Sequence, residues 1–299
     1  MKRYIKRLLN NISPQAPKTE EYHLLLGRVL SEAIKNKKQI KSLKEVEFKV
    51  FSQFGDDGII QWLVNNLDIS STSFIEFGVE DFKESNTRFL MMNDNWSGFV
   101  MDGSESSIDK LMGAEYFWQY QLTAKAIFID RDNISGLLSA ANLGKNIGLL
   151  HIDLDGNDYW IWEAITEISS DILILEYNSV FGKERAITVP YDKGFYRTKA
   201  HTSNLYFGAS LKALYNLSKK KGYAFIGCNS AGNNAYFIKN EKLNDVVREC
   251  SLEQGFVESK FRESRDSEGK LSYLNGEARL AEIKGMPVYN VETNEIEEL

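Results

Sequence analysis

Apolar positions along this chain follow two patterns that alternate. Short, continuous apolar runs are typical of buried strands, whereas apolar residues three or four positions apart are typical of amphipathic helices. The runs predict strands at residues 73–79, 97–104, 124–130, 146–155, 171–178, 223–229 and 235–240. The helical spacing predicts helices at residues 18–40, 54–67, 86–94, 132–142, 157–168 and 207–221. Strands that alternate with helices indicate an α/β fold, in which helices cover both faces of a parallel sheet.

The last two predicted strands are separated only by the short turn "SAGN" (230–233). Such a turn joins antiparallel strands, so the sheet is expected to end in a hairpin. Outside the middle of the chain the alternation weakens. We therefore expect an N-terminal helical extension (1–48), an α/β domain (49–240) and a C-terminal appendage (241–299).

The composition narrows the class of protein. With 43% hydrophobic and 26% charged residues, the chain of 299 residues is typical of a soluble globular protein. A net charge of -6 weighs against nucleic acid as a partner. The two cysteines, Cys228 and Cys250, form no CxxC motif, so neither a disulfide framework nor a zinc site is expected. This usage suits a reducing cytoplasm.

The basic opening "MKRYIKRLLNNI" lacks the apolar core and cleavage site of a signal peptide. No apolar run approaches the roughly 20 residues needed to span a bilayer, so no transmembrane segment is expected. Two interpretations of the opening remain. Lys2, Arg3, Lys6 and Arg7 contact a membrane surface, or they form the solvated face of an ordinary helix.

Acidic and amide side chains stand where the predicted parallel strands end. They are Glu76, Glu80, Asp102, Asp130, Asp153, Asp155, Glu176 and Asn178. In open α/β sheets, ligands bind outside the carboxyl ends of the strands. Because five successive strands end this way, we expect a ligand site along this edge of the sheet.

Several of these segments carry a family resemblance. "FIEFGVED", "GFVMDGS", "LLHIDLDGNDYWIWEAI", "ILILEYN" and "GYAFIGCNSAGNNAYF" resemble the class I S-adenosylmethionine-dependent methyltransferases over residues 50–240. More narrowly, they resemble the FkbM-like methyltransferases of bacterial polysaccharide and natural-product clusters. The resemblance implies a Rossmann-like sheet, S-adenosyl-L-methionine as cofactor, and methylation of an oxygen, less readily a nitrogen, on a small-molecule or glycan-precursor acceptor. The resemblance leaves open whether the protein forms a homo-oligomer.

The resemblance also implies which residues bind the cofactor. They are Glu76, Gly78, Glu80, Asp102, Gly103, Ser104, Asp130 and Asp153. Asp102 would accept hydrogen bonds from both ribose hydroxyls, because a carboxylate can accept two at once, and Asp130 would lie against the adenine. Gly78 is the only glycine in the first turn, which departs from the glycine-rich signature of the family.

Each of these assignments has a structural alternative. Asp102 is suited to capping the following helix, and Asp130 to a solvated turn. Glu80 is placed to pair with Arg88 across the first turn. Asn86 is expected to cap the helix that begins beside it.

A divalent metal site is a further implication of the resemblance. Asp153, Asp155, Glu176 and Asn178 would supply hard oxygen ligands, which suit Mg²⁺ or Mn²⁺. Alternatively, Asp153 contacts the amine of the cofactor while "DGND" caps the next helix. Asp153 is thus a catalytic candidate in either case. Without a metal, His201 would be the general base, whereas His151 is expected to be a buried core residue.

The polar and aromatic segment 178–206 is expected to bind the acceptor. Its aromatic rings suit sugar faces, and Lys183, Arg185 and Arg197 suit an anionic group. A structural lid is the alternative. Two other functions remain open: a nucleotide-dependent oxidoreductase, against which the missing GxGxxG motif counts, and a non-catalytic scaffold of the same fold.

Overall fold

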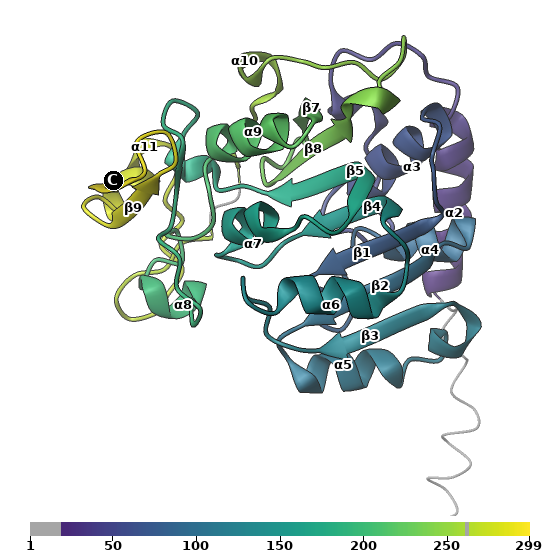
Figure 1. Cartoon of the computed structure of the whole chain (residues 1–299), viewed down its shortest axis with the longest axis horizontal. Coiled ribbons are helices and arrows are strands. Elements are labelled where there is room, and N and C mark those ends of the chain that lie inside the picture. The colour runs from purple at the N-terminus through teal and green to yellow at the C-terminus, as the bar shows by residue number, and fades with distance from the viewer. Residues whose placement is uncertain (1–18, 261–262) are drawn as a thin grey trace, which may run out of the picture.

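The computed structural model describes residues 19–260 and 263–299 and is built around a seven-stranded sheet (Figure 1). The strands lie in the order β3-β2-β1-β4-β5-β8-β7. They are β1 (Ser73–Phe77), β2 (Ser97–Asp102), β3 (Leu122–Ala126), β4 (Asn146–Ile152), β5 (Ser169–Glu176), β7 (Tyr223–Cys228) and β8 (Asn234–Lys239). The first five are parallel, and β8 is antiparallel to both β5 and β7. The expected α/β sheet with a terminal hairpin is confirmed.

Helices cover both faces of this sheet, each over its own apolar core. One face carries α3 (Asp56–Asn66), α4 (Arg88–Asp94) and α5 (Glu105–Met112). The other carries α6 (Ile134–Ala141), α7 (Asp158–Ala164) and α9 (Leu211–Lys220). Among the described residues, no helix is both long and apolar enough to cross a membrane.

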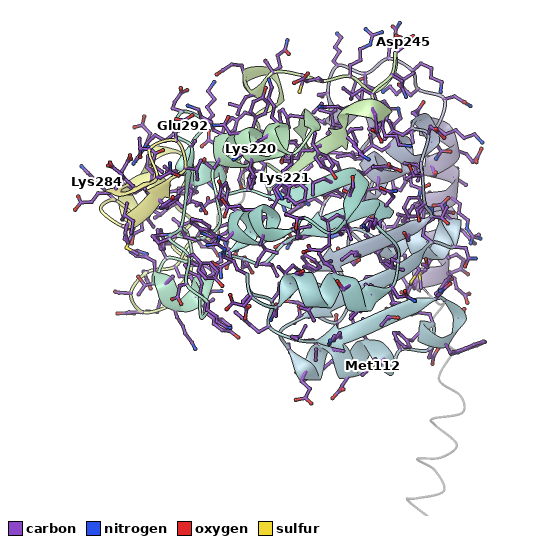
Figure 2. All side chains as sticks on the ribbon, in the orientation of Figure 1. Met112, Lys220, Lys221, Asp245, Lys284 and Glu292 are labelled. Atoms are coloured by element: carbon purple, nitrogen blue, oxygen red, sulfur yellow. The ribbon has the colours of Figure 1, made fainter. Side chains whose placement is uncertain are left out.

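Lys221, labelled in Figure 2, joins two helices of the second face. It follows α9 and donates through Nζ to the carbonyl oxygens of Glu163 and Ile165, at the end of α7. A cation beside the last carbonyls of a helix is favoured by the helix dipole. Burial nevertheless lowers the pKa of Lys221 to about 8.

The N-terminal helix α2 (Thr19–Ile34) packs beside α3 and α4. It makes this contact through Gly27, where a larger side chain would overlap with Val50 and Phe89. The short helix η1 (Leu43–Val46) then leads into α3. The basic residues Lys2, Arg3, Lys6 and Arg7 lie outside the described residues, so the two interpretations of that segment stay predictions.

Several predicted boundaries were wrong. The helix predicted at 18–40 ends at Ile34, and the strand predicted at 146–155 ends at Ile152. The third strand ends at Ala126 rather than 130, because its partner β2 ends at Asp102, opposite Ala126. Asp130 lies in a turn, where its carboxylate accepts the N–H groups of Asp132 and Asn133. Helix α4 begins at Arg88 after Thr87, and Asn86 does not cap it. The backbone N–H of Asn86 donates instead to Glu76 Oε1 at 2.9 Å.

A second, three-stranded sheet joins the C-terminal residues to the segment that follows β5. It has the order β10-β9-β6 and consists of β6 (Ile187–Thr188), β9 (Pro287–Asn290) and β10 (Glu295–Glu298). Apolar residues from both segments form a core between them: Phe181, Ile187, Val189, Leu205, Tyr206, Ile283 and Val288. The short helices α8 (Arg197–Ala200), α10 (Leu252–Gly255) and α11 (Glu277–Glu282) complete these regions.

Candidate active site

A large cavity of about 870 Å³ lies at the carboxyl ends of β1, β2 and β4. Most of the predicted cofactor residues line it: Gly78, Glu80, Asp102, Gly103, Ser104 and Asp153. Two smaller cavities adjoin it. One, of about 210 Å³, contains Glu76, His151 and Glu176; the other, of about 200 Å³, contains Glu176 and C-terminal residues.

The turn after β1 packs closely against the end of β4. Gly78 has a φ of +72°, and a side chain there would overlap with the carbonyl oxygen of Asp153. Only glycine tolerates both conditions. Glu80 and Phe82 also have positive φ angles, 46° and 60°, which costs free energy for non-glycine residues. A single glycine thus gives this turn a close backbone approach without a glycine-rich sequence.

Asp102 fixes the loops around the large cavity and also faces it. Its Oδ2 accepts the N–H of Glu80 at 2.8 Å, and its Oδ1 accepts the N–H of Ser104 at 2.7 Å. Each carboxylate oxygen has a further lone pair. The cap of α5 is Ser104, whose side chain accepts from the Ser107 N–H, so the capping alternative for Asp102 was wrong. Arg88, the proposed partner of Glu80, pairs with Glu20 instead.

Asp130 belongs to a turn. Besides the two N–H groups that it accepts, its Oδ2 pairs with Lys193 Nζ at 2.8 Å. Burial alone would raise the pKa of Asp130, but Lys193 and the N–H groups outweigh it and lower the pKa. Within the described chain, the large cavity is lined by its neighbours Ile127, Phe128 and Ile129 rather than by Asp130. The adenine contact through Asp130 therefore gains no support.

Glu76 is buried and closely surrounded by donors. Its oxygens accept from the Ser85 and Thr87 hydroxyls and the Asn86 N–H, and Oε1 lies 3.0 Å from His151 Nδ1. Burial opposes ionisation of both partners. The interaction between Glu76 and His151 outweighs this effect, lowering the pKa of Glu76 and raising that of His151. Glu76 lines the 210 Å³ cavity rather than the large one.

Three of the four predicted metal ligands converge. Single oxygens of Asp153, Asp155 and Glu176 all lie within 4.8 Å of one another. Asp155 reaches this position with a φ of 52°, after β4 has ended. Asp158 holds the loop, because its carboxylate accepts the N–H groups of Leu154 and Gly156. We refer to Asp153, Asp155 and Glu176 as the acid cluster.

The environment of the acid cluster favours protonation. Burial, followed by the charge of Asp155, raises the pKa of Asp153 to about 7, although its side chain is partly exposed. Burial and the charges of Asp153 and Asp155 raise the pKa of Glu176 well above its usual range. Glu176 Oε2 is buried, and none of the described residues gives it a hydrogen-bond partner. Buried carboxylate oxygens rarely stay unpaired, so the cluster is suited to a cationic or donating ligand.

Arg197 of α8 partly balances these charges. Its Nη1 lies 2.7 Å from Asp155 Oδ1, and its Nη2 lies 3.6 Å from Glu263. The guanidinium stacks on the Phe207 ring at 3.8 Å and lines all three cavities. Segment 178–206 thereby supplies a cation at the point where the cavities meet.

Asn178 and His201 take structural positions. The Asn178 side chain accepts from the Val180 N–H and donates to the carbonyl oxygens of Leu205 and Phe207. His201 Nδ1 contacts the hydroxyl and N–H of Ser203. In the described chain, His201 is absent from the linings of the three cavities. A metal ligand at Asn178 and a base at His201 gain no support.

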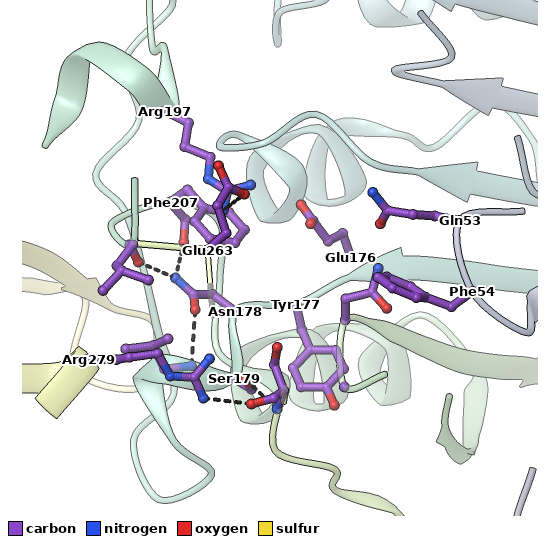
Figure 3. Close-up of a pocket in the computed structure, with 15 residues that line it drawn as sticks. Gln53, Phe54, Glu176, Tyr177, Asn178, Ser179, Arg197, Phe207, Glu263 and Arg279 are labelled. Atoms are coloured by element: carbon purple, nitrogen blue, oxygen red, sulfur yellow. Dashed lines mark hydrogen bonds and ion pairs between the residues drawn. The ribbon is translucent and has the colours of Figure 1, made fainter. Parts of the chain in front are cut away.

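Sequence reasoning missed several residues of the 200 Å³ cavity, which Figure 3 shows. Gln53 and Asn233 come from segments before α3 and between β7 and β8, and Glu263 and Arg279 from the C-terminal region. None of these residues lies at the end of a parallel strand. The strand-end pattern therefore gave no signal for them.

Comparison with known proteins gave matches of structure alone: no family model and no curated protein matches the chain. An O-methyltransferase from Bacillus cereus in complex with SAH is 12% identical, with a TM-score of 0.42; the match covers 79% of this chain and 96% of that one. The SAH-bound N-terminal domain of EvdMO1 is 11% identical, with a TM-score of 0.37 and coverage of 56% and 73%.

A third match is an S-adenosylmethionine-dependent methyltransferase from Clostridium acetobutylicum. It is 11% identical, with a TM-score of 0.39 and coverage of 61% of this chain and 89% of that one. Identities and TM-scores at this level assign neither a family nor an activity to the chain.

Proposed function

We propose that this protein is an S-adenosylmethionine-dependent methyltransferase. The observation that carries the proposal is the 870 Å³ cavity, which runs from Asp102 at the end of β2 to Asp153 after β4. A nucleoside with a cationic tail matches such a cavity. Carboxylate oxygens at one end suit the ribose hydroxyls, and acidic groups at the other suit the ammonium and sulfonium groups.

The adenine would lie against Ile127, Phe128 and Ile129. Phe128 is 39% exposed and stacks on Tyr196, with ring centroids 5.7 Å apart. An exposed aromatic pair at the wall of a cavity is suited to a planar base. Tyr196 precedes Arg197, so the same segment would contact the base and the acid cluster.

The acid cluster fits a divalent cation by its chemistry. Three carboxylates supply hard oxygen ligands, and the unpaired Glu176 Oε2 is the kind of atom that a cation would satisfy. Asp153, Asp155 and Glu176 would hold Mg²⁺ or Mn²⁺, and Arg197 would have to release Asp155 in part. A bound cation would supply a Lewis acid that lowers the pKa of an acceptor hydroxyl.

Without a cation, the acid cluster itself would accept the proton of the acceptor. A pKa near 7 suits a general base at neutral pH, and Asp153 has this property. Asp153 also borders both the large cavity and the 210 Å³ cavity. It is therefore the catalytic residue in either version of the mechanism.

The acceptor is proposed to be an oxygen on a sugar or glycan precursor of bacterial surface polysaccharide or natural-product synthesis. Two observations support a ring-shaped polar acceptor: the aromatic residues Phe54 and Phe207 and the amides Gln53 and Asn233 line the cavity next to the acid cluster. Aromatic faces and amide groups are suited to sugar rings.

Isothermal calorimetry with S-adenosylhomocysteine and with NADH tests this proposal. We expect the first to bind with a stoichiometry of one per chain and the second not to bind. Binding of NADH alone would favour the oxidoreductase. Binding of neither would favour the non-catalytic scaffold and contradict the proposal.

A further inference from the structure

The charges around the 870 Å³ cavity are unequal. Five acids line it: Glu80, Asp102, Asp153, Asp155 and Glu263. Among the described lining residues, Arg197 is the one cation. Because like charges repel one another at short range, a ligand that carries a carboxylate would be disfavoured at most positions in this cavity. The position beside Arg197 is the exception.

The guanidinium of Arg197 is held in a defined orientation. Its Nε donates to the carbonyl oxygen of Asn204 at 2.8 Å, and its Nη1 donates to Asp155 Oδ1 at 2.7 Å. The guanidinium also stacks on the Phe207 ring, and the two groups lie together in Figure 3. An oriented guanidinium loses little conformational freedom when it forms further hydrogen bonds.

The same guanidinium keeps donors for a ligand. Of its five N–H groups, the contacts with Asn204 and Asp155 use one at Nε and one at Nη1. Nη2 lies 3.6 Å from a carboxylate oxygen of Glu263, which is longer than a hydrogen bond. The Arg197 side chain is 21% exposed. Within the described chain, the N–H groups of Nη2 are therefore available to a carboxylate in the cavity.

Arg197 also lies close to the acids that suit an ammonium group. Its partner Asp155 and Asp153 each place an oxygen within 4.8 Å of the other, and both acids line the large cavity. An amino acid carries its carboxylate and its ammonium on one carbon atom. The cavity offers the matching pair of opposite charges, Arg197 and Asp153, at neighbouring positions.

The residue before Arg197 lies against a different part of the cavity wall. Tyr196 stacks on Phe128, and both line the large cavity. This is the wall at which the proposed function places the adenine. Two consecutive residues are therefore suited to contact the base and the amino-acid part of one ligand.

We propose that Arg197 binds the carboxylate of the methionine part of the cofactor and thereby selects S-adenosylmethionine over nucleosides that lack this group. Asp153 faces the neighbouring ammonium. The inference rests on the proposed function for the identity of the cofactor. It changes the interpretation of segment 178–206, because the arginine expected to bind an anionic acceptor binds the cofactor instead.

Wild-type protein provides the first test. Calorimetric titrations with S-adenosylhomocysteine, decarboxylated S-adenosylhomocysteine and methylthioadenosine compare three ligands that share the nucleoside. The second lacks only the carboxylate, and the third lacks the whole amino-acid part. A charge-assisted contact predicts at least about tenfold tighter binding of S-adenosylhomocysteine than of its decarboxylated analogue. Equal affinities for these two ligands would overturn the proposal.

Variants locate the carboxylate. We expect Arg197→Met to remove the preference for S-adenosylhomocysteine over the decarboxylated analogue. Arg197→Lys should keep part of it, because lysine retains the charge but not the planar group. Arg248→Met is the matched control and should keep the full preference, since Arg248 is exposed and lies outside the large cavity. A preference that survives in folded Arg197→Met would overturn the proposal.

The remaining outcomes separate this inference from the proposed function. Binding of none of the three ligands would contradict both. Binding of S-adenosylhomocysteine without a preference over the decarboxylated analogue would leave the proposed function standing and overturn the assignment of Arg197. If Arg197→Met does not fold, Arg197→Lys decides: a reduced preference supports the contact, and a preference equal to that of the wild type overturns it.

Discussion

Glu76 and Glu176 occupy equivalent places and have opposite environments. Each is a glutamate near the carboxyl end of a parallel strand, and each is buried, at 2% and 8% exposure. Glu76 accepts several hydrogen bonds and pairs with His151, and its pKa is lowered. Glu176 has one buried oxygen without a partner among the described residues, and its pKa is raised.

The difference shows how one sheet edge holds two kinds of buried acid. The loop after β1 supplies hydrogen-bond donors to Glu76, the hydroxyls of Ser85 and Thr87. The loop after β4 places two carboxylates, those of Asp153 and Asp155, close to Glu176. A buried carboxylate that accepts hydrogen bonds from nearby donors stabilises the fold. A buried carboxylate that lies among other carboxylates favours binding of a ligand that supplies positive charge.

The largest expected effect is on stability. Glu76→Gln replaces one acceptor oxygen by an NH2 group, which would face other hydrogen-bond donors. It also breaks the pair with His151. Breaking a buried pair costs about 3–5 kcal/mol, so we expect the free energy of unfolding in urea to fall by that amount. Glu176→Gln is the matched variant. It should change stability by less than about 1 kcal/mol, because burial and the neighbouring carboxylates already disfavour the charged form of Glu176. Equal losses would remove the distinction.

For metal affinity we expect the larger effect from the substitution at Glu176, whereas for stability we expect it at Glu76. Glu176→Gln keeps the shape of the side chain and removes a ligand charge, so Mn²⁺ binding should weaken by at least about tenfold. Glu263→Gln, next to Arg197 but outside the acid cluster, serves as the control. Calorimetric Mn²⁺ titration provides the measurement. Wild-type protein that binds no Mn²⁺ would leave Asp153 as a base without a cation.

The acid cluster should also link cation binding to pH. The folded pKa of Asp153, about 7, lies above its ordinary value of 3.8. The folded chain therefore retains a proton that the unfolded chain has lost, and the stability of the cation-free protein should fall as pH rises from about 4 to 7. A cation must displace that proton, so Mn²⁺ affinity should drop about tenfold per pH unit below 7. A flat profile between pH 5 and 7 would contradict this assignment.

The sequence predicted the sheet, its terminal hairpin and the edge where the acids converge, because strand alternation and strand ends are local patterns. It did not distinguish Glu76 from Glu176, since their partners come from other loops. Asn178 and His201 gain no support as site residues for a related reason: nearby backbone atoms after β5 engage their side chains. Arg279 comes from α11 in the C-terminal region, far from β5 in sequence, so no local pattern predicted that it lines a cavity with Glu176.

The turn after β2 offers the most direct test of the cofactor site. Asp102 holds two loops and faces the large cavity, so Asp102→Ala should weaken S-adenosylhomocysteine binding. Hydrogen bonds to a charged group contribute about 1.5–3 kcal/mol each, which predicts at least about a tenfold loss of affinity. Asp109→Ala, at an exposed position of α5, should bind as the wild type does.

Calorimetric titration of S-adenosylhomocysteine into wild type, Asp102→Ala and Asp109→Ala, with each variant's thermal unfolding recorded, is the decisive measurement. The account predicts tight binding by wild type and Asp109→Ala, and weakened binding by an Asp102→Ala variant that remains folded. Unchanged affinity in folded Asp102→Ala would contradict the placement of the cofactor in the 870 Å³ cavity.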